Sequence, residues 1–316
     1  MPTVRLNNGT WLQDSSHIID ELEALHPNPS IHPSGAKQKL FSYLIELHGD
    51  EWLPMVALHY RWHLKENKAF ALKEFKRYGL PWSPYFLSTP LVLPIAKKMQ
   101  SYLPALGVTD KTIPALEHFT QTLLNNLDNH FQQHRYLFGD RPSIGDFALF
   151  GPIWAHLYRD PGSTFLFNKV PQVKEWMERL LDPSPFEGNY LPEDQVPETL
   201  FPILRCIFRD QIPWIQTLRT AINQWCEANP QAKRVPRSLG FAEFSIGNAT
   251  ERRKLITFVQ WKAQRAWASY ENSTSEEKVE VDQFLLRLGL PNPFIDSFEN
   301  PLVRHNFKPF LANAAR

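Results

Sequence analysis

The chain has 316 residues, a formal net charge of +1 and a hydrophobic fraction of 43%. That length allows one large domain or two smaller ones with a substantial core, and the near-zero charge argues against a nucleic-acid partner. Two cysteines, Cys206 and Cys226, are too few for a disulfide framework or a zinc site. No apolar run approaches the ~18–20 residues of a membrane span, and the polar start is no signal peptide. We therefore expect a cytoplasmic protein without a membrane segment.

The first 25 residues predict two short strands followed by a helix. Thr3 to Leu6 alternate like a strand, Asn7 to Thr10 form a hairpin signal, and Trp11-Leu12 can be the returning strand. Asp14 or Ser15 can cap the helix that follows. The apolar residues of this helix recur at helical spacing: Ile18, Ile19, Leu22 and Leu25. Strand, hairpin, strand and helix in this order make up the last third of a thioredoxin-like domain.

The next region predicts a linker and then a long helix. The proline-rich segment 26–33 cannot continue a helix. Ala36 to about Glu66 has helical periodicity, and Pro54 should kink or divide it. His59 and His63 stand at i and i+4, a spacing that can hold a metal, but no third ligand is apparent. We expect a surface or core pair rather than a metal site.

The stretch from Tyr136 to Phe150 predicts a buried helix with a well-defined start. A Leu-Phe-Gly loop and an Asp-Arg-Pro turn lead to Ser143, a preferred N-cap residue. Asp146 can accept a hydrogen bond from the Ser143 amide, as in a capping box, and its charge suits the first helical turn. The residues that follow are apolar nearly all round, so this helix should lie in the core. We expect Ser143 and Asp146 to be structural and not to touch a ligand.

The remaining segments predict more helices with little recognisable chemistry. We expect an irregular aromatic-rich insertion at 79–93, helices at 112–134, from 170 and at 196–228, a short strand or extended arm at 241–247, and helices capped by Thr250 and Ser275. The helix from Thr250 to Tyr270 would have a basic, solvated face, and both cysteines would be buried structural thiols. The residues of that basic face are Arg252, Arg253, Lys254, Lys262 and Arg265.

Two of these stretches together resemble the glutathione S-transferase family, over about residues 2–180. That family starts the central helix of its C-terminal domain with a Leu-x-Gly loop, Pro, Ser or Thr, and Asp three residues on, matched here by Ser143 and Asp146. Its N-terminal domain has a Pro, a strand, Asp-Gly, a strand, and an acidic residue before Ser. The matching positions are Pro2, Asn8-Gly9 and Asp14-Ser15.

The resemblance implies a mainly α fold in which a transferase C-terminal helical bundle follows a β-β-α remnant of a thioredoxin-like domain. The partial glutathione-binding domain would span residues 1–27, the linker 28–35, the helical domain 36–182, and a helical C-terminal extension packed on it 183–316. The family's first strand, first helix and second strand would precede Pro2. We therefore expect the natural start to lie upstream of Met1, with the catalytic segment missing.

The resemblance also implies a ligand site. Pro2 would be a cis-proline whose neighbouring backbone binds the cysteinyl part of glutathione, and Asp14 and Ser15 would hold its γ-glutamyl end. A carboxylate suits an ammonium group, and a hydroxyl with free amides at a helix N-terminus suits a carboxylate. The alternative is that Asp14 and Ser15 only cap their helix. Acceptor-pocket candidates, for which core packing is an equally good explanation, are Trp52, His59, Tyr60 and Trp62.

The implied activity is that of a glutathione transferase. Glutathione would be the co-substrate, an apolar electrophile would receive the sulfur by conjugation or thiol transfer, and no metal would take part. The implied protein could form a homodimer, and its catalytic residue stays unassigned. The main alternative is a non-catalytic transferase-like scaffold for dimerisation or partner binding. A third is ligand storage in an aromatic pocket around Trp52 and Trp62.

Overall fold

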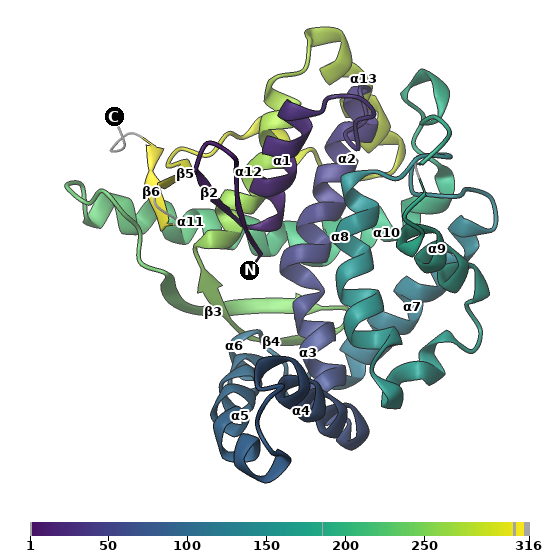
Figure 1. Ribbon diagram of the computed structural model, residues 1–316. Coiled ribbons are helices and arrows are strands. Elements are labelled where there is room, and N and C mark those ends of the chain that lie inside the picture. Colours follow the sequence, from purple (N-terminus) through teal and green to yellow (C-terminus); the bar gives the residue numbers. More distant parts are fainter. Residues whose placement is uncertain (1, 185, 306–307, 313–316) are drawn as a thin grey trace.

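The computed structural model describes residues 2–184, 186–305 and 308–312, and it is mainly α-helical (Figure 1). The mainly α prediction with a small N-terminal β-β-α unit is confirmed. The helices are α1 (Ser15–Leu25), α2 (Ala36–Leu47), α3 (Pro54–His63), α4 (Lys65–Gly79), α5 (Tyr85–Gln100), α6 (Tyr102–Ala105), α7 (Ile113–Phe131), α8 (Ile144–Pro152), α9 (Pro171–Leu181), α10 (Phe201–Cys206), α11 (Ile212–Ala228), α12 (Phe258–Glu271) and α13 (Ser275–Arg287). Among the described residues, none of these helices is long and apolar enough to cross a membrane.

Three two-stranded antiparallel hairpins complete the described fold. They are β1 (Thr3–Arg5) with β2 (Trp11–Gln13), β3 (Ser238–Ile246) with β4 (Ala249–Ile256), and β5 (Leu302–His305) with β6 (Lys308–Leu311). The N-terminal hairpin is the predicted one. Val4 pairs with Leu12, and the turn contains Gly9 at φ 87°, where a side chain would be strained. This hairpin and α1 lie beside α12, which comes from the other end of the chain (Figure 1).

The predicted break at Pro54 is present and has a defined form. Between α2 and α3 the chain forms one wide π-helical turn, η1 (His48–Trp52), and Pro54 is at the first turn of α3. Gly49 allows this turn to approach α8, because a Cβ there would lie 2.5 Å from the Ala148 carbonyl oxygen. The α2–η1–α3 rod therefore packs along α8 in the centre of the molecule (Figure 1). Wide turns of this kind are frequent at functional sites.

The capping box at the start of α8 is confirmed and is more extensive than predicted. Asp146 is fully buried, and its Oδ2 accepts hydrogen bonds from the amide of Ser143 at 2.8 Å and its hydroxyl at 2.9 Å. The other oxygen, Oδ1, accepts from the amide of Leu137 and from Nε1 of Trp176, both at 3.1 Å. One carboxylate thus joins the loop before α8, the helix start and α9.

Two sequence predictions about secondary structure are wrong. The segment expected to be an irregular insertion at 79–93 contains the first half of α5, which includes Pro90 and Pro94. The helix expected from Thr250 instead begins at Phe258, and Ala249–Ile256 is strand β4. Gly247, at φ 58°, and Asn248 form the tight turn between β3 and β4, which is a hairpin signal that outweighs the N-cap preference of Thr250.

Candidate functional site

Asp14 is the N-cap of α1 and has an unusual backbone conformation. Its φ of 84° and ψ of 134° lie in a region that costs a non-glycine residue about 1–3 kcal/mol and that is concentrated at functional sites. Its Oδ1 accepts a hydrogen bond from the amide of Ser16 at 3.1 Å, and its own amide donates to the Pro2 carbonyl at 3.1 Å. Ser15 is exposed at the first position of the helix. The predicted residues Pro2, Asp14 and Ser15 are therefore neighbours, whereas the Met1–Pro2 bond, predicted to be cis, lies outside the described residues.

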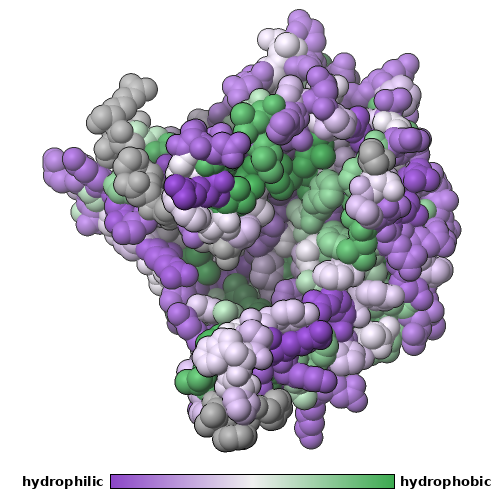
Figure 2. All heavy atoms as spheres, in the orientation of Figure 1, coloured by the Kyte–Doolittle hydropathy of each residue, from purple (hydrophilic) through white to green (hydrophobic). Residues whose placement is uncertain are grey.

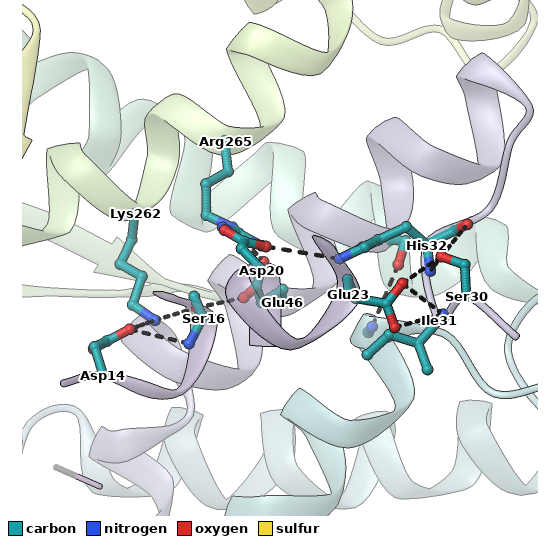
Figure 3. Close-up of polar contacts among 12 residues, drawn as sticks. Asp14, Ser16, Asp20, Glu23, Ser30, Ile31, His32, Glu46, Lys262 and Arg265 are labelled. Carbon is teal, nitrogen blue, oxygen red and sulfur yellow. Dashed lines mark hydrogen bonds and ion pairs between the residues drawn. The ribbon is translucent and has the colours of Figure 1, made fainter. Parts of the chain in front are cut away.

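The carboxylate of Asp14 is paired with a lysine from α12. Lys262 Nζ lies 2.9 Å from Asp14 Oδ1 and donates to the Ser16 hydroxyl at 2.6 Å (Figure 3). It also lies 2.7 Å from Asp50 Oδ2. Both Asp14 and Lys262 are 4% exposed. One ammonium group from the C-terminal part thus joins the start of α1 to the η1 turn.

A second basic residue of α12 extends this network one turn further. Arg265 Nε donates to Glu46 of α2 at 2.9 Å, and its terminal nitrogens bind the carboxylate of Asp20 on α1 (Figure 3). The Ser16 hydroxyl, which accepts from Lys262, donates to Glu46 and connects the two pairs. Lys262 and Arg265 are three residues apart, so they project from the same side of the helix. Together they hold α1 against α2.

The network keeps Lys262 charged although it is buried. Burial alone would lower the pKa of Lys262, but the neighbouring carboxylates of Asp50 and Asp14 raise it above its ordinary value. Burial raises the pKa of Glu46, and the Arg265 guanidinium opposes that effect. The arrangement is a largely buried cluster in which each of the four carboxyl groups lies against Lys262 or Arg265.

The four acceptor-pocket candidates lie in the core. Trp52, His59, Tyr60 and Trp62 are between 1% and 4% exposed, which leaves almost no surface for a substrate to touch in this arrangement. His59 contacts His63 through its Nδ1 at 2.8 Å and Glu117 through its Nε2 at 3.1 Å. In the part of the chain that is described, no group of three or more His, Cys, Asp and Glu side chains could hold a metal ion. The core-packing explanation therefore accounts for what these four side chains do.

Two of the basic residues expected on a solvated helix face make buried contacts that sequence reasoning missed. Arg253 and Lys262 are buried, at 3% and 4% exposed. Arg253 lies on β4, and its guanidinium is 4.8 Å from the ring centre of Trp52 and 5.5 Å from that of Trp214. Burial in this aromatic cage lowers the pKa of Arg253 to about 10. The prediction of a solvated side chain was wrong for Arg253 and Lys262, because partners from distant segments cover them, whereas Arg252 is exposed.

Neither cysteine has the environment of a reactive thiolate. Cys206 and Cys226 are both partly buried and free. Burial raises the pKa of Cys206 to about 12, with the carboxylate of Asp210 acting in the same direction. Burial also raises the pKa of Cys226. Both side chains are therefore neutral thiols at physiological pH.

The described structure is a mainly helical body with a β-β-α unit at its N-terminus, and Asp14 caps the helix of that unit. Residues 86–182 match the family model described as glutathione S-transferase, C-terminal domain. This segment of the chain is therefore similar to the C-terminal domain of glutathione S-transferases. The wider domain limits given above, including 36–182, stay a prediction.

Other comparisons add little detail. A solved structure of a glutathione S-transferase from Xanthobacter autotrophicus Py2 is 20% identical, with 61% of this chain and 73% of that chain covered. Its TM-score is 0.31, so the two chains superpose too poorly for positions to be transferred between them. Comparison with curated proteins finds no match.

Proposed function

We propose that this protein binds glutathione at the start of α1 and serves its conjugation, or thiol transfer, to an electrophilic small molecule. The strained N-cap at Asp14 carries the proposal, because it places a carboxylate and the amide end of a helix side by side. The carboxylate can pair with the ammonium group of the γ-glutamyl unit. The exposed Ser15 hydroxyl and the helix N-terminus can receive the carboxylate of the same unit.

The binding of glutathione at Asp14 depends on what happens to Lys262. Because its ammonium group lies 2.9 Å from Asp14, the amine of glutathione must displace it or share the carboxylate with it. A displaced Lys262 would still have Asp50 as a partner, at 2.7 Å in the present arrangement. The exchange therefore does not strand a buried charge, which would be strongly unfavourable.

The same ion pair favours a second candidate function, a non-catalytic scaffold. In a scaffold the Asp14–Lys262 pair would be permanent and would only fasten the C-terminal part to α1. Transfer chemistry requires the glutathione thiol to be activated as a thiolate, and we assign no residue to that role. Both cysteines are unsuited to it because their pKa values are raised.

Calorimetric titration with glutathione separates the two candidates. We expect the wild type to bind, Asp14→Asn to bind at least tenfold more weakly, and Lys262→Met to bind more tightly, with exposed Lys65→Met as the matched control. Conjugation to 1-chloro-2,4-dinitrobenzene then tests the chemistry. If folded wild type and Lys262→Met both fail to bind glutathione, the transferase proposal is refuted and the scaffold remains.

A further inference from the structure

A large cavity shares no lining residue with the Asp14 network, although His48 of its lining is on the same η1 turn as Asp50. Its volume is about 1100 Å³, which exceeds the roughly 300–1,000 Å³ of common small-molecule sites. Its walls come from η1, α7, α10, the π-helical turn Ile207–Gln211, the β3–β4 turn and the segment after α13. The apolar part of the lining includes Pro114, Phe119, Leu123, Ile203, Leu288 and Leu290.

The charged groups of this lining are all basic. Arg205, Arg209 and His118 line the cavity, and its described lining contains no Asp or Glu. Arg209 is held by Asp210, which accepts from its Nε and Nη2, both at 2.7 Å. Arg205 is exposed and makes no hydrogen bond or ion pair with any residue that the structure describes. Its guanidinium is therefore hydrated and free to bind a ligand in place of water.

The buried end of the cavity is uncharged. His48 lines it, is 1% exposed, and shares a hydrogen bond of 2.7 Å with Gln211 through its Nδ1. Burial lowers the pKa of His48 to about 4, so the imidazole is neutral at physiological pH. Its ring lies edge-on to Phe119 with centres 5.9 Å apart. The cavity thus has a neutral, largely apolar interior and arginines at its exposed margin.

We propose that this cavity binds a small apolar carboxylic acid, with its alkyl or aromatic part inside and its carboxylate on Arg205 and Arg209. A guanidinium binds a carboxylate with charge-assisted hydrogen bonds, and the apolar interior rejects a second charge. Cys206 is in the wall, 3.4 Å from Arg209 Nη2, and remains a neutral thiol, so the association is non-covalent. This site is independent of the proposed glutathione site.

Titration with decanoate and with 1-decanol tests the charge recognition. We expect decanoate to bind and 1-decanol to bind at least tenfold more weakly. Arg205→Gln should weaken decanoate binding about tenfold and leave the binding of 1-decanol, which has no charge, unchanged. The variant should leave the fold intact, because Arg205 has no hydrogen-bond or ion-pair partner among the described residues. The matched control is Arg77→Gln on α4, outside the cavity. Equal binding of the acid and the alcohol, or no effect of Arg205→Gln, would overturn the proposal.

Thiol labelling tests the location. Decanoate should slow the reaction of Cys206 with N-ethylmaleimide and leave Cys226, which is outside the cavity, unchanged. Thr122→Trp, which fills the cavity from an exposed position on α7, should abolish both decanoate binding and the protection. Binding without protection of Cys206, or binding that survives Thr122→Trp in a folded variant, would place the ligand elsewhere and refute the site.

Discussion

Asp14 and Asp146 are both buried aspartates at the start of a helix, but they are stabilised in different ways. Asp146 accepts hydrogen bonds from neutral donors fixed in α8, its preceding loop and α9. Asp14 has one local amide donor, Ser16, and depends on Lys262 for its counter-charge. Both side chains are at most 4% exposed, so burial does not distinguish them.

The difference teaches which of the two can take part in binding. The partners of Asp146 are backbone and indole groups that can be replaced only by disrupting the helix start. The partner of Asp14 is a flexible ammonium group, for which a ligand's ammonium is a chemical equivalent. The cap at Asp146 is therefore a stability element, and the cap at Asp14, which is paired with Lys262, is the candidate site. The following predictions test this contrast.

Removing Lys262 should have the largest effect. In Lys262→Met, Asp14 and Asp50 lose a buried counter-charge, and we expect the free energy of unfolding to fall by about 4 kcal/mol. Chemical denaturation measures the change, with Lys65→Met as a control that should stay within about 0.5 kcal/mol of wild type. Adding Asp14→Asn to Lys262→Met should restore part of the loss. A loss below about 1 kcal/mol would show that the pair is not formed in solution.

Asp146→Asn should have the second largest effect and lower the free energy of unfolding by about 3 kcal/mol. The amide group of Asn must direct an NH₂ toward donors that now face a carboxylate oxygen, either those of Ser143 or those of Leu137 and Trp176. Denaturant titration beside the exposed Asp110→Asn gives the comparison. The contrast between the two caps is lost if Asp146→Asn costs no more than the same change at Asp14.

Lowering the pH should destabilise the protein, because protonation of His130 disturbs the region before α8. This fully buried imidazole contacts the Tyr136 carbonyl through its Nε2 at 3.1 Å, and burial lowers its pKa to about 3. Because the folded-state pKa is below the unfolded value of 6.5, stability is lost as the pH falls below 6.5. Between pH 7.5 and 5 this amounts to about 2 kcal/mol, which His130→Gln should remove. A control at the partly exposed His17, His17→Gln, should keep the full pH dependence.

Asp14→Asn should have the smallest effect on stability, about 1 kcal/mol. Asn tolerates a positive φ and still accepts a hydrogen bond from the Ser16 amide, while Lys262 keeps Asp50. Its effect on glutathione binding should be much larger than its effect on unfolding. A thermal melt and a titration on the same sample compare the two. A melt that falls as far as that of Asp146→Asn would mean that Asp14 is itself a structural cap.

The features that were predicted correctly are those that depend on interactions between residues close together in the sequence. The hairpin at Gly9, the cap at Asp14, the break at Pro54 and the capping box at Ser143 each depend on neighbours a few residues away. The bond from Trp176 to the same box could not be predicted, because it joins segments 30 residues apart.

The candidate site was predicted only on its N-terminal side. Asp14 and Ser15 were identified by their place before a helix, but nothing near Lys262 in the sequence indicates burial. Its carboxylate partners are more than 200 residues away, and a lysine on an amphipathic helix is most often solvated. Arg253 was missed for a related reason, since the hairpin turn at Gly247 was read as part of an arm leading into a helix.

The bond between Lys262 and Ser16 has a consequence for the order of folding. The two residues are 246 positions apart, so the contact closes a very long loop and must form late, at a high entropic cost. During synthesis α1 leaves the ribosome long before α12 exists, and its carboxylates stay hydrated until then. The contacts of the N-terminal unit with α12 can therefore form only when most of the chain has been made, whereas the Ser16–Glu46 contact with α2 can form earlier.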